Sequence, residues 1–208
     1  MDDWQATASF SFCSSWPAPV VTSEVYDRVM AEVIGPTIRG MAADGAAYTG
    51  FLYAGLMITA DGTPKVIEFN CRFGDPEAQP VLMRLKSDLV TLCNQAIDGA
   101  LAGVTLDWDA RASLGVVMAA GGYPESYDKG DAISGLEPTG DDALKVFHAG
   151  TRVENGQVVT NGGRVLCVVG LGDDVAEAQA KAYQGVHGID WKDRYFRTDI
   201  GYRAINRG

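Results

Sequence analysis

Apolar residues near the start of the chain recur with a helical period, at Val25, Val29, Val33 and Ile38. Thr22 or Ser23 can cap this helix, because either hydroxyl can accept a hydrogen bond from a backbone N–H of the first turn. Gly35 and Pro36 interrupt the pattern, since proline lacks the backbone donor that a helix interior needs. The sequence therefore predicts a helix with a kink or a break at Gly35 and Pro36.

A different pattern follows at residues 48–60, which are rich in aromatic and β-branched side chains. Asp61 and Gly62 form a tight-turn dipeptide, and residues 65–70 alternate between apolar and polar positions. Alternation with period two is typical of a half-buried strand, and Asp-Gly between two such runs favours a hairpin. The sequence predicts an antiparallel β-hairpin around Asp61 and Gly62.

Beyond a loop at residues 71–77, the periodicity predicts one helix over residues 78–101. Its expected buried side consists of Leu82, Leu85, Leu89, Leu92 and Ile97. The polar stretch 102–110, which carries Trp108, is the best candidate for an internal boundary.

The second half is mostly strand-like. We expect strands at residues 113–119, 145–149, 157–160 and 164–170, and a turn at Asn161-Gly162-Gly163. One amphipathic helix is expected over residues 174–185, capped by Asp173. This pattern predicts an α+β chain with an antiparallel sheet, divided into an atypical N-terminal segment (1–16), a first domain (17–103) and a small α+β C-terminal domain (104–208).

Charge and composition narrow the classes of partner and compartment. The 208 residues carry a formal net charge of −10, which disfavours a nucleic-acid or anionic-membrane partner. The apolar runs 114–120 and 165–170 are far shorter than the roughly 20 residues of a bilayer span. Four dispersed cysteines and two histidines do not have the spacing of a zinc site, and unpaired thiols favour the reducing cytoplasm.

The densest group of functional side chains lies in the run VIEFNCRFGDPE, residues 66–77. Glu68 and Asn70 are two apart on the predicted strand and therefore project from one face. A carboxylate and an amide oxygen side by side suit Mg²⁺, and Arg72 would continue that face with a guanidinium for a phosphoryl group, provided that the strand extends so far. The alternative is an exposed strand face with an incidental ion pair.

The chain also resembles a known family. The resemblance rests on YTGFLYAGLMITADGTPKVIEFNCRFGDPEAQ, SLGVVMAAGGYP, KVFHAGT, VVTNGGRVL and DIGYRAI, in this order. These runs are similar to glycinamide ribonucleotide synthetases, the phosphoribosylamine–glycine ligases. The resemblance begins at about Pro17 and covers the family's C-terminal half. It implies the C-terminal part of an ATP-grasp domain, followed by the family's C-terminal domain. It further implies a ligase that activates glycine as an acyl phosphate with ATP and transfers it to 5-phosphoribosylamine in purine biosynthesis.

The resemblance implies roles for individual residues. Glu68 and Asn70 would hold Mg²⁺ or Mn²⁺ that bridges the phosphates of ATP, and Arg72 would steady the transferred phosphoryl group as a catalytic residue. Gly74 would let the backbone approach the substrate, and Asp75 would contact the amine of glycine or the ribose hydroxyls. For Asp75 and Glu77 the alternative role is capping the helix that begins at Ala78.

The matched runs include no counterpart of the family's N-terminal substrate domain or of the subdomain that clamps the nucleotide. We therefore expect a truncated chain that is inactive alone and that would need a complementary N-terminal chain. Two alternatives remain open: another ATP-grasp ligase that joins a carboxylate to an amine, or a non-catalytic fragment or subunit of a split enzyme.

Overall fold

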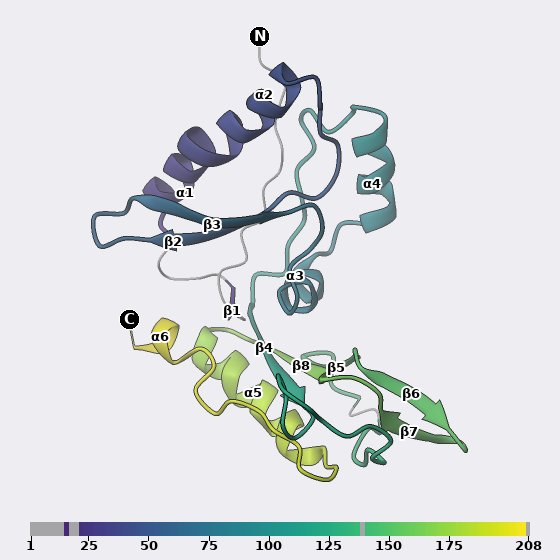
Figure 1. Cartoon of the computed structure of the whole chain (residues 1–208). Coiled ribbons are helices and arrows are strands. Elements are labelled where there is room, and N and C mark those ends of the chain that lie inside the picture. Colours follow the sequence, from purple (N-terminus) through teal and green to yellow (C-terminus); the bar gives the residue numbers. More distant parts are fainter. Residues whose placement is uncertain (1–14, 17–20, 138–139, 207–208) are drawn as a thin grey trace. The chain divides into compact units, whose positions relative to one another are not determined.

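The computed structural model describes residues 15–16, 21–137 and 140–206. The chain folds into two compact units, and Figure 1 labels their helices and strands. Of the described residues, the first unit comprises 21–75 and 85–109, and the second comprises 15–16, 76–84, 110–137 and 140–206. No helix within the described ranges is long and apolar enough to cross a bilayer. The domain limits at residues 16 and 103 stay a prediction.

The first unit begins with one continuous helical segment made of α1 (Ser23–Val29), a π-helical turn η1 (Met30–Ile34) and α2 (Gly35–Ala43). Capping by Thr22 is confirmed, because its Oγ1 accepts a hydrogen bond from the Val25 N–H at 3.3 Å. Of the predicted kink or break at Gly35 and Pro36, a break is wrong, because the helix is continuous there and has a π-helical turn just before Gly35. The Gly35 N–H instead donates to the carbonyl of Met30, five residues earlier, and this wider turn lets the helix continue into Pro36.

The predicted hairpin is confirmed as β2 (Tyr53–Ile58) paired antiparallel with β3 (Pro64–Asn70), which we call the ribbon. In its turn, the Gly62 N–H donates to the carbonyl of Thr59 at 2.9 Å. The Asp61 carboxylate accepts hydrogen bonds from the hydroxyls of Thr59 and Thr63 and from the Thr63 N–H, and these bonds lower its pKa to about 2. Helices α1 and η1 pack against β3.

The single helix predicted over residues 78–101 is wrong. The structure has α3 (Ala78–Arg84) and α4 (Leu89–Ile97), separated by residues that take part in an extended pairing. Leu85 forms a β-bridge with Trp108, and the Lys86 N–H donates to the carbonyl of Asp107 at 2.9 Å. Asp88 then caps α4 by accepting a bond from the Thr91 N–H. Ile97, expected on the buried side, is 76% exposed.

The second unit is built on a four-stranded antiparallel sheet. Its order is β1-β4-β8-β5, with bounds Ser15–Trp16, Ala112–Ala119, Arg164–Gly172 and Leu144–His148. A separate ribbon pairs β6 (Thr151–Glu154) with β7 (Gln157–Thr160) around Asn155 and Gly156, both of which have positive φ. The four predicted strands are confirmed, and so is the turn at residues 161–163 between β7 and β8, whereas β1 and β6 were not predicted.

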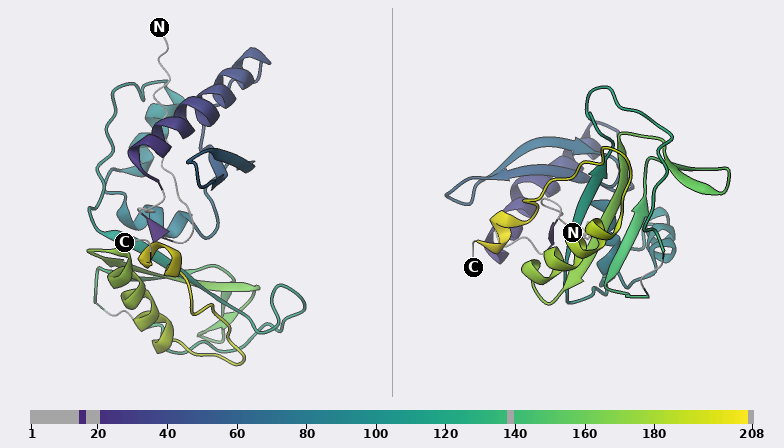
Figure 2. Two further views of the ribbon diagram at one scale, coloured as in Figure 1. Left: turned by 90° about the vertical axis from the view of Figure 1, so that its left-hand side faces the viewer. Right: turned by 90° about the horizontal axis from the view of Figure 1, so that it is seen from below.

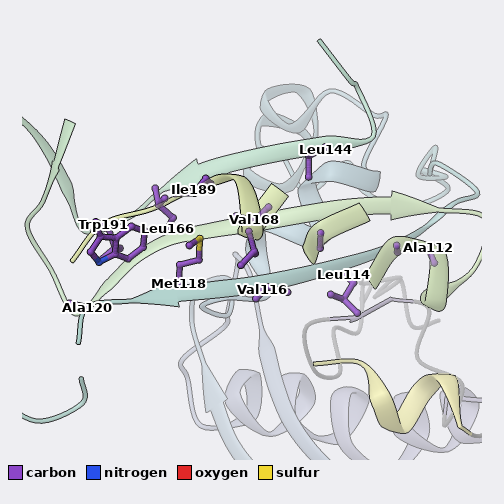
Figure 3. Close-up of a cluster of buried hydrophobic side chains, with 14 residues drawn as sticks. Ala112, Leu114, Val116, Met118, Ala120, Leu144, Leu166, Val168, Ile189 and Trp191 are labelled. Carbon is purple, nitrogen blue, oxygen red and sulfur yellow. The ribbon is translucent and has the colours of Figure 1, made fainter. Parts of the chain in front are cut away.

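The core of the second unit lies between this sheet and α5 (Val175–Gly188), which runs along one face of the sheet (Figure 2). Fourteen buried residues form one cluster there, and Figure 3 shows side chains from β4, β5 and β8 in it. Gly170 permits this packing, because a Cβ at that position would lie 2.4 Å from the carbonyl oxygen of Ala178 in α5. The short α6 (Tyr202–Ile205) follows, and Gln179 holds the segment before it by donating to the carbonyl of Ile200 at 2.6 Å.

The cap of α5 differs from the predicted one. The carboxylate of Asp174, not that of Asp173, accepts a hydrogen bond from the Glu177 N–H at 2.8 Å. The Glu177 carboxylate in turn accepts one from the Asp173 N–H at 2.7 Å. Two backbone donors at the start of the helix are thereby satisfied.

We expect Asp174→Ala to lower the free energy of unfolding by about 1 kcal/mol, because it leaves the Glu177 N–H without its acceptor. Chemical denaturation would measure the change. Asp173→Ala is the matched control and should have a clearly smaller effect, since it is the backbone of Asp173 that takes part in the cap. An equal loss in both variants would contradict this assignment.

Candidate metal and phosphate site

The ribbon places Glu68 and Asn70 on the same face. Glu68 pairs with Gly55, and Asn70 pairs with Tyr53, with no irregularity between these two pairs. Residues two apart on a regular strand project to the same side. The one register shift of the ribbon occurs just before, where Leu56 pairs with Val66.

Gly55 makes room for the Glu68 side chain. A Cβ on Gly55 would lie 3.0 Å from Cγ of Glu68, so the glutamate extends across the space that this glycine leaves open. The Tyr53 ring lies on the same side, with Cε1 at 3.6 Å from that Cβ position. No local sequence signal marks Gly55 or Tyr53, because their place opposite Glu68 and Asn70 depends on the register of the ribbon.

The donor set on this face fits a hard divalent cation. Glu68 is exposed and Asn70 is half-buried, so both can reach a ligand from solvent. Mg²⁺ often takes one or two protein oxygens and completes its shell with water and phosphate oxygens. The described part of the chain contains no group of three or more His, Cys, Asp or Glu side chains that could hold a metal. A site here would therefore rest on these two oxygen ligands, and their convergence on one cation stays a prediction.

Arg72 does not continue the strand. β3 ends at Asn70, and Arg72 lies in a bend, exposed, where its Nη1 donates to the carbonyl of Phe73 at 2.7 Å. Alternation along β3 therefore does not place Arg72 on the face of Glu68. Its guanidinium retains further N–H donors for an anion, because one of five is used in this bond.

Gly74 and Asp75 follow in the same loop. Gly74 is buried, whereas Asp75 is exposed and begins a three-residue turn that ends at Glu77. Glu77 contributes to the start of α3 through its backbone, since its carbonyl accepts a bond from the Val81 N–H at 3.2 Å. A substrate contact and a capping role for the Asp75 and Glu77 carboxylates both stay open as predictions.

Aromatic contacts hold the loop after β3 against the segment before β2. The rings of Phe51 and Phe73 lie 4.2 Å apart between centroids. The Tyr48 hydroxyl donates to the carbonyl of Phe51 at 2.7 Å. Burial raises the pKa of Tyr48, and the nearby Cys71 thiol adds to this shift. The aromatic residues of the range 48–53 favour a strand by their type, but Tyr48 and Phe51 precede β2 and take part in these contacts instead.

Two family models match the chain. The ATP-grasp (A) domain of phosphoribosylglycinamide synthetase matches residues 7–78, and the C domain of the same enzyme matches residues 113–203. The first match begins inside the segment 1–16 that the sequence analysis set apart. It contains the whole ribbon and all five predicted site residues.

Curated relatives agree with these matches. The phosphoribosylamine–glycine ligase of Allochromatium vinosum is 64% identical over 191 residues, which make up 92% of this chain and 45% of the relative. The ligase of the same name from Escherichia coli O6:H1 is 62% identical over 194 residues, again 92% of this chain and 45% of the relative. The chain thus spans less than half the length of these relatives.

Solved structures of similar fold include an enzyme of the same name as the curated relatives. A crystal structure of phosphoribosylamine–glycine ligase from Thermotoga maritima matches with a TM-score of 0.77 and 33% identity, covering 89% of this chain and 45% of that one. The N5-carboxyaminoimidazole ribonucleotide synthetase of Thermotoga maritima matches with a TM-score of 0.56 at 16% identity, over 85% of this chain and 45% of that one, and this likeness concerns the fold alone. The predicted α+β class, with part of an ATP-grasp domain followed by a C-terminal domain, is confirmed.

We expect Gly55→Val to weaken divalent-cation binding several-fold, because the new side chain would push the Glu68 carboxylate aside. Titration with Mn²⁺, followed by relaxation of water protons, would measure binding. Gly40→Ala is the control, since a Cβ on Gly40 meets no atom within 4 Å. Equal cation affinity in the Gly55 and Gly40 variants would remove Glu68 from the site.

Proposed function

The chain belongs to the phosphoribosylglycinamide synthetase family, and on that premise we propose that it forms one wall of the Mg²⁺-ATP site of a ligase. The reaction would join glycine to 5-phosphoribosylamine and give glycinamide ribonucleotide, through a glycyl phosphate. The chain spans less than half the length of its relatives, so the activity of the whole ligase is a proposal.

One observation carries this proposal: Glu68 and Asn70 share the face of the ribbon on which Gly55 leaves space for the glutamate. Their oxygens would hold Mg²⁺ or Mn²⁺ against the phosphates of ATP. The cation would supply charge neutralisation to the phosphoryl group that moves to glycine. The protein's share of such a transfer is mainly alignment and electrostatic stabilisation, which two fixed oxygen ligands can provide.

The loop after β3 would act on the substrates. Arg72 would bind phosphoryl and acyl-phosphate oxygens with the donors that its bond to Phe73 leaves available. Because Gly74 has no side chain, a substrate would be able to approach its backbone closely. Asp75, exposed at the start of the turn, would accept hydrogen bonds from the amine of glycine or from ribose hydroxyls.

The partners of the complete reaction are ATP, glycine and 5-phosphoribosylamine. The negative net charge and the free thiols of Cys71 and Cys93 support a place in the cytoplasm, without a nucleic-acid or membrane partner.

We expect Glu68→Gln and Asn70→Leu each to weaken Mn²⁺ binding in the presence of ATP by about tenfold or more, because each removes one of two protein ligands. Calorimetry of the full chain would measure the affinity. Glu154→Gln removes an exposed carboxylate from the other ribbon and should leave the affinity unchanged. If Glu154→Gln weakens binding as much as Glu68→Gln does, the cation is held by general surface charge.

We expect the chain alone to show no glycine-dependent turnover, because this wall lacks the opposing groups that enclose the nucleotide. Each tenfold in rate corresponds to about 1.4 kcal/mol of barrier, so loss of several positioning groups removes many such factors together. The assay couples ADP release to glycine and freshly generated 5-phosphoribosylamine. Turnover comparable to that of a full-length relative, abolished by Arg72→Ala, would contradict this prediction.

A further inference from the structure

The face of the ribbon that carries Glu68 and Asn70 also receives side chains from β2. Tyr53 pairs with Asn70 and Gly55 pairs with Glu68, and residues that pair across an antiparallel ladder share a face. Residues 48–60, which include all of β2, contain no Asp or Glu. The strand opposite the two oxygen ligands therefore adds no carboxylate to the site and places an aromatic ring and a glycine beside them.

The ring of Tyr53 lies next to the side chain of Glu68. A Cβ built on Gly55 would lie 3.0 Å from Cγ of Glu68 and 3.6 Å from Cε1 of Tyr53, so both atoms border the space that Gly55 leaves open. Tyr53 is the diagonal neighbour of Glu68, because it pairs with Asn70, two positions farther along β3. Such neighbours lie within reach of aromatic and long side chains. The ring thus forms one wall of the space across which Glu68 extends.

This wall matters because little else restrains the Glu68 carboxylate. Glu68 is exposed, and within the described part of the chain no hydrogen bond or ion pair fixes its side chain. A free glutamate side chain occupies several rotamers, and fixing one of them costs conformational entropy when a ligand binds. A neighbouring ring that already limits these rotamers reduces that cost.

We propose that Tyr53 is a positioning residue of the cation site: its ring packs against the Glu68 side chain and holds the carboxylate on the side of Asn70. The inference rests on the proposed function, because Tyr53 acts only through the cation that Glu68 and Asn70 would bind. Tyr53 is half-buried, whereas Glu68 is exposed, so the ring can serve as a fixed support for the more mobile side chain. A tyrosine offers a large contact area with only two side-chain torsions to fix.

The alternative role for the ring is to stabilise the ribbon as a whole, and Phe69 separates the two roles. Phe69 lies between Glu68 and Asn70 in the sequence, but it pairs with Ala54 and therefore occupies the opposite face. Loss of the Phe69 ring removes aromatic packing from the same ribbon without removing the wall beside Glu68. Phe69→Ala is therefore the matched control for Tyr53→Ala.

The test measures Mn²⁺ binding to the full chain in the presence of ATP, by relaxation of water protons. We expect Tyr53→Ala to weaken binding about tenfold, because residues that orient metal ligands typically contribute at least this factor to the affinity. Tyr53→Phe keeps the ring and should restore the affinity to within twofold of the unchanged chain, and Phe69→Ala should also stay within twofold. Circular dichroism verifies folding, and Tyr53→Val, which suits a strand, replaces Tyr53→Ala if that variant does not fold.

A double-mutant cycle tests whether Tyr53 acts through Glu68. Glu68→Ala removes the side chain that the ring positions, so adding Tyr53→Ala to it should weaken Mn²⁺ binding less than twofold further. A ring that only stabilised the ribbon would weaken binding by the same factor with and without Glu68.

Three results would overturn the proposal: equal weakening by Tyr53→Ala and Phe69→Ala, a loss in Tyr53→Phe as large as that in Tyr53→Ala, or independent effects in the cycle with Glu68→Ala. These results are separable from a failure of the proposed function. If Glu68→Ala leaves the Mn²⁺ affinity unchanged, the metal site itself is wrong and the role of Tyr53 falls with it. If Glu68→Ala weakens binding and Tyr53→Ala does not, the metal site stands and only the role of Tyr53 is wrong.

Discussion

One irregular step in the register of the ribbon decides where the candidate site lies. Leu56 pairs with Val66, yet the next residue, Gly55, pairs with Glu68, so Ile67 has no partner in the ladder. Paired residues share a face, and Leu56 marks the buried one, at 4% exposure. Without the extra residue, Glu68 would lie on the face that carries Leu56, Val66 and Phe69, whose apolar side chains disfavour a carboxylate. The bulge moves both Glu68 and Asn70 to the opposite face.

The two units differ in the size of their buried apolar cores. The second buries one continuous core between the sheet and α5, and glycines in β8 allow the helix to approach the strand closely. The first has a long helical segment, a ribbon and a helix with no buried residue. A large apolar core normally stabilises a domain, and the described residues of the first unit bury fewer large apolar side chains than those of the second.

The smaller core of the first unit matters for the metal site proposed on its ribbon. A metal site with two protein oxygens is weak unless phosphate oxygens fill the remaining positions, and a nucleotide held from one side loses little of its hydration. The groups that enclose the nucleotide from the other side would therefore decide how tightly Glu68 and Asn70 hold the cation.

The sequence by itself determined the local features: the hairpin turn at Asp61 and Gly62, the Thr22 cap, the strands of the second unit, and the common face of Glu68 and Asn70. These depend on residues close in the chain, where turn chemistry and alternation act directly. The tertiary structure decided which face Glu68 occupies, because that depends on pairing across the ribbon. It also split the predicted helix over residues 78–101, since the backbone of Leu85 and Lys86 bonds to residues more than twenty positions away. A periodic apolar pattern carries no signal of such a distant partner.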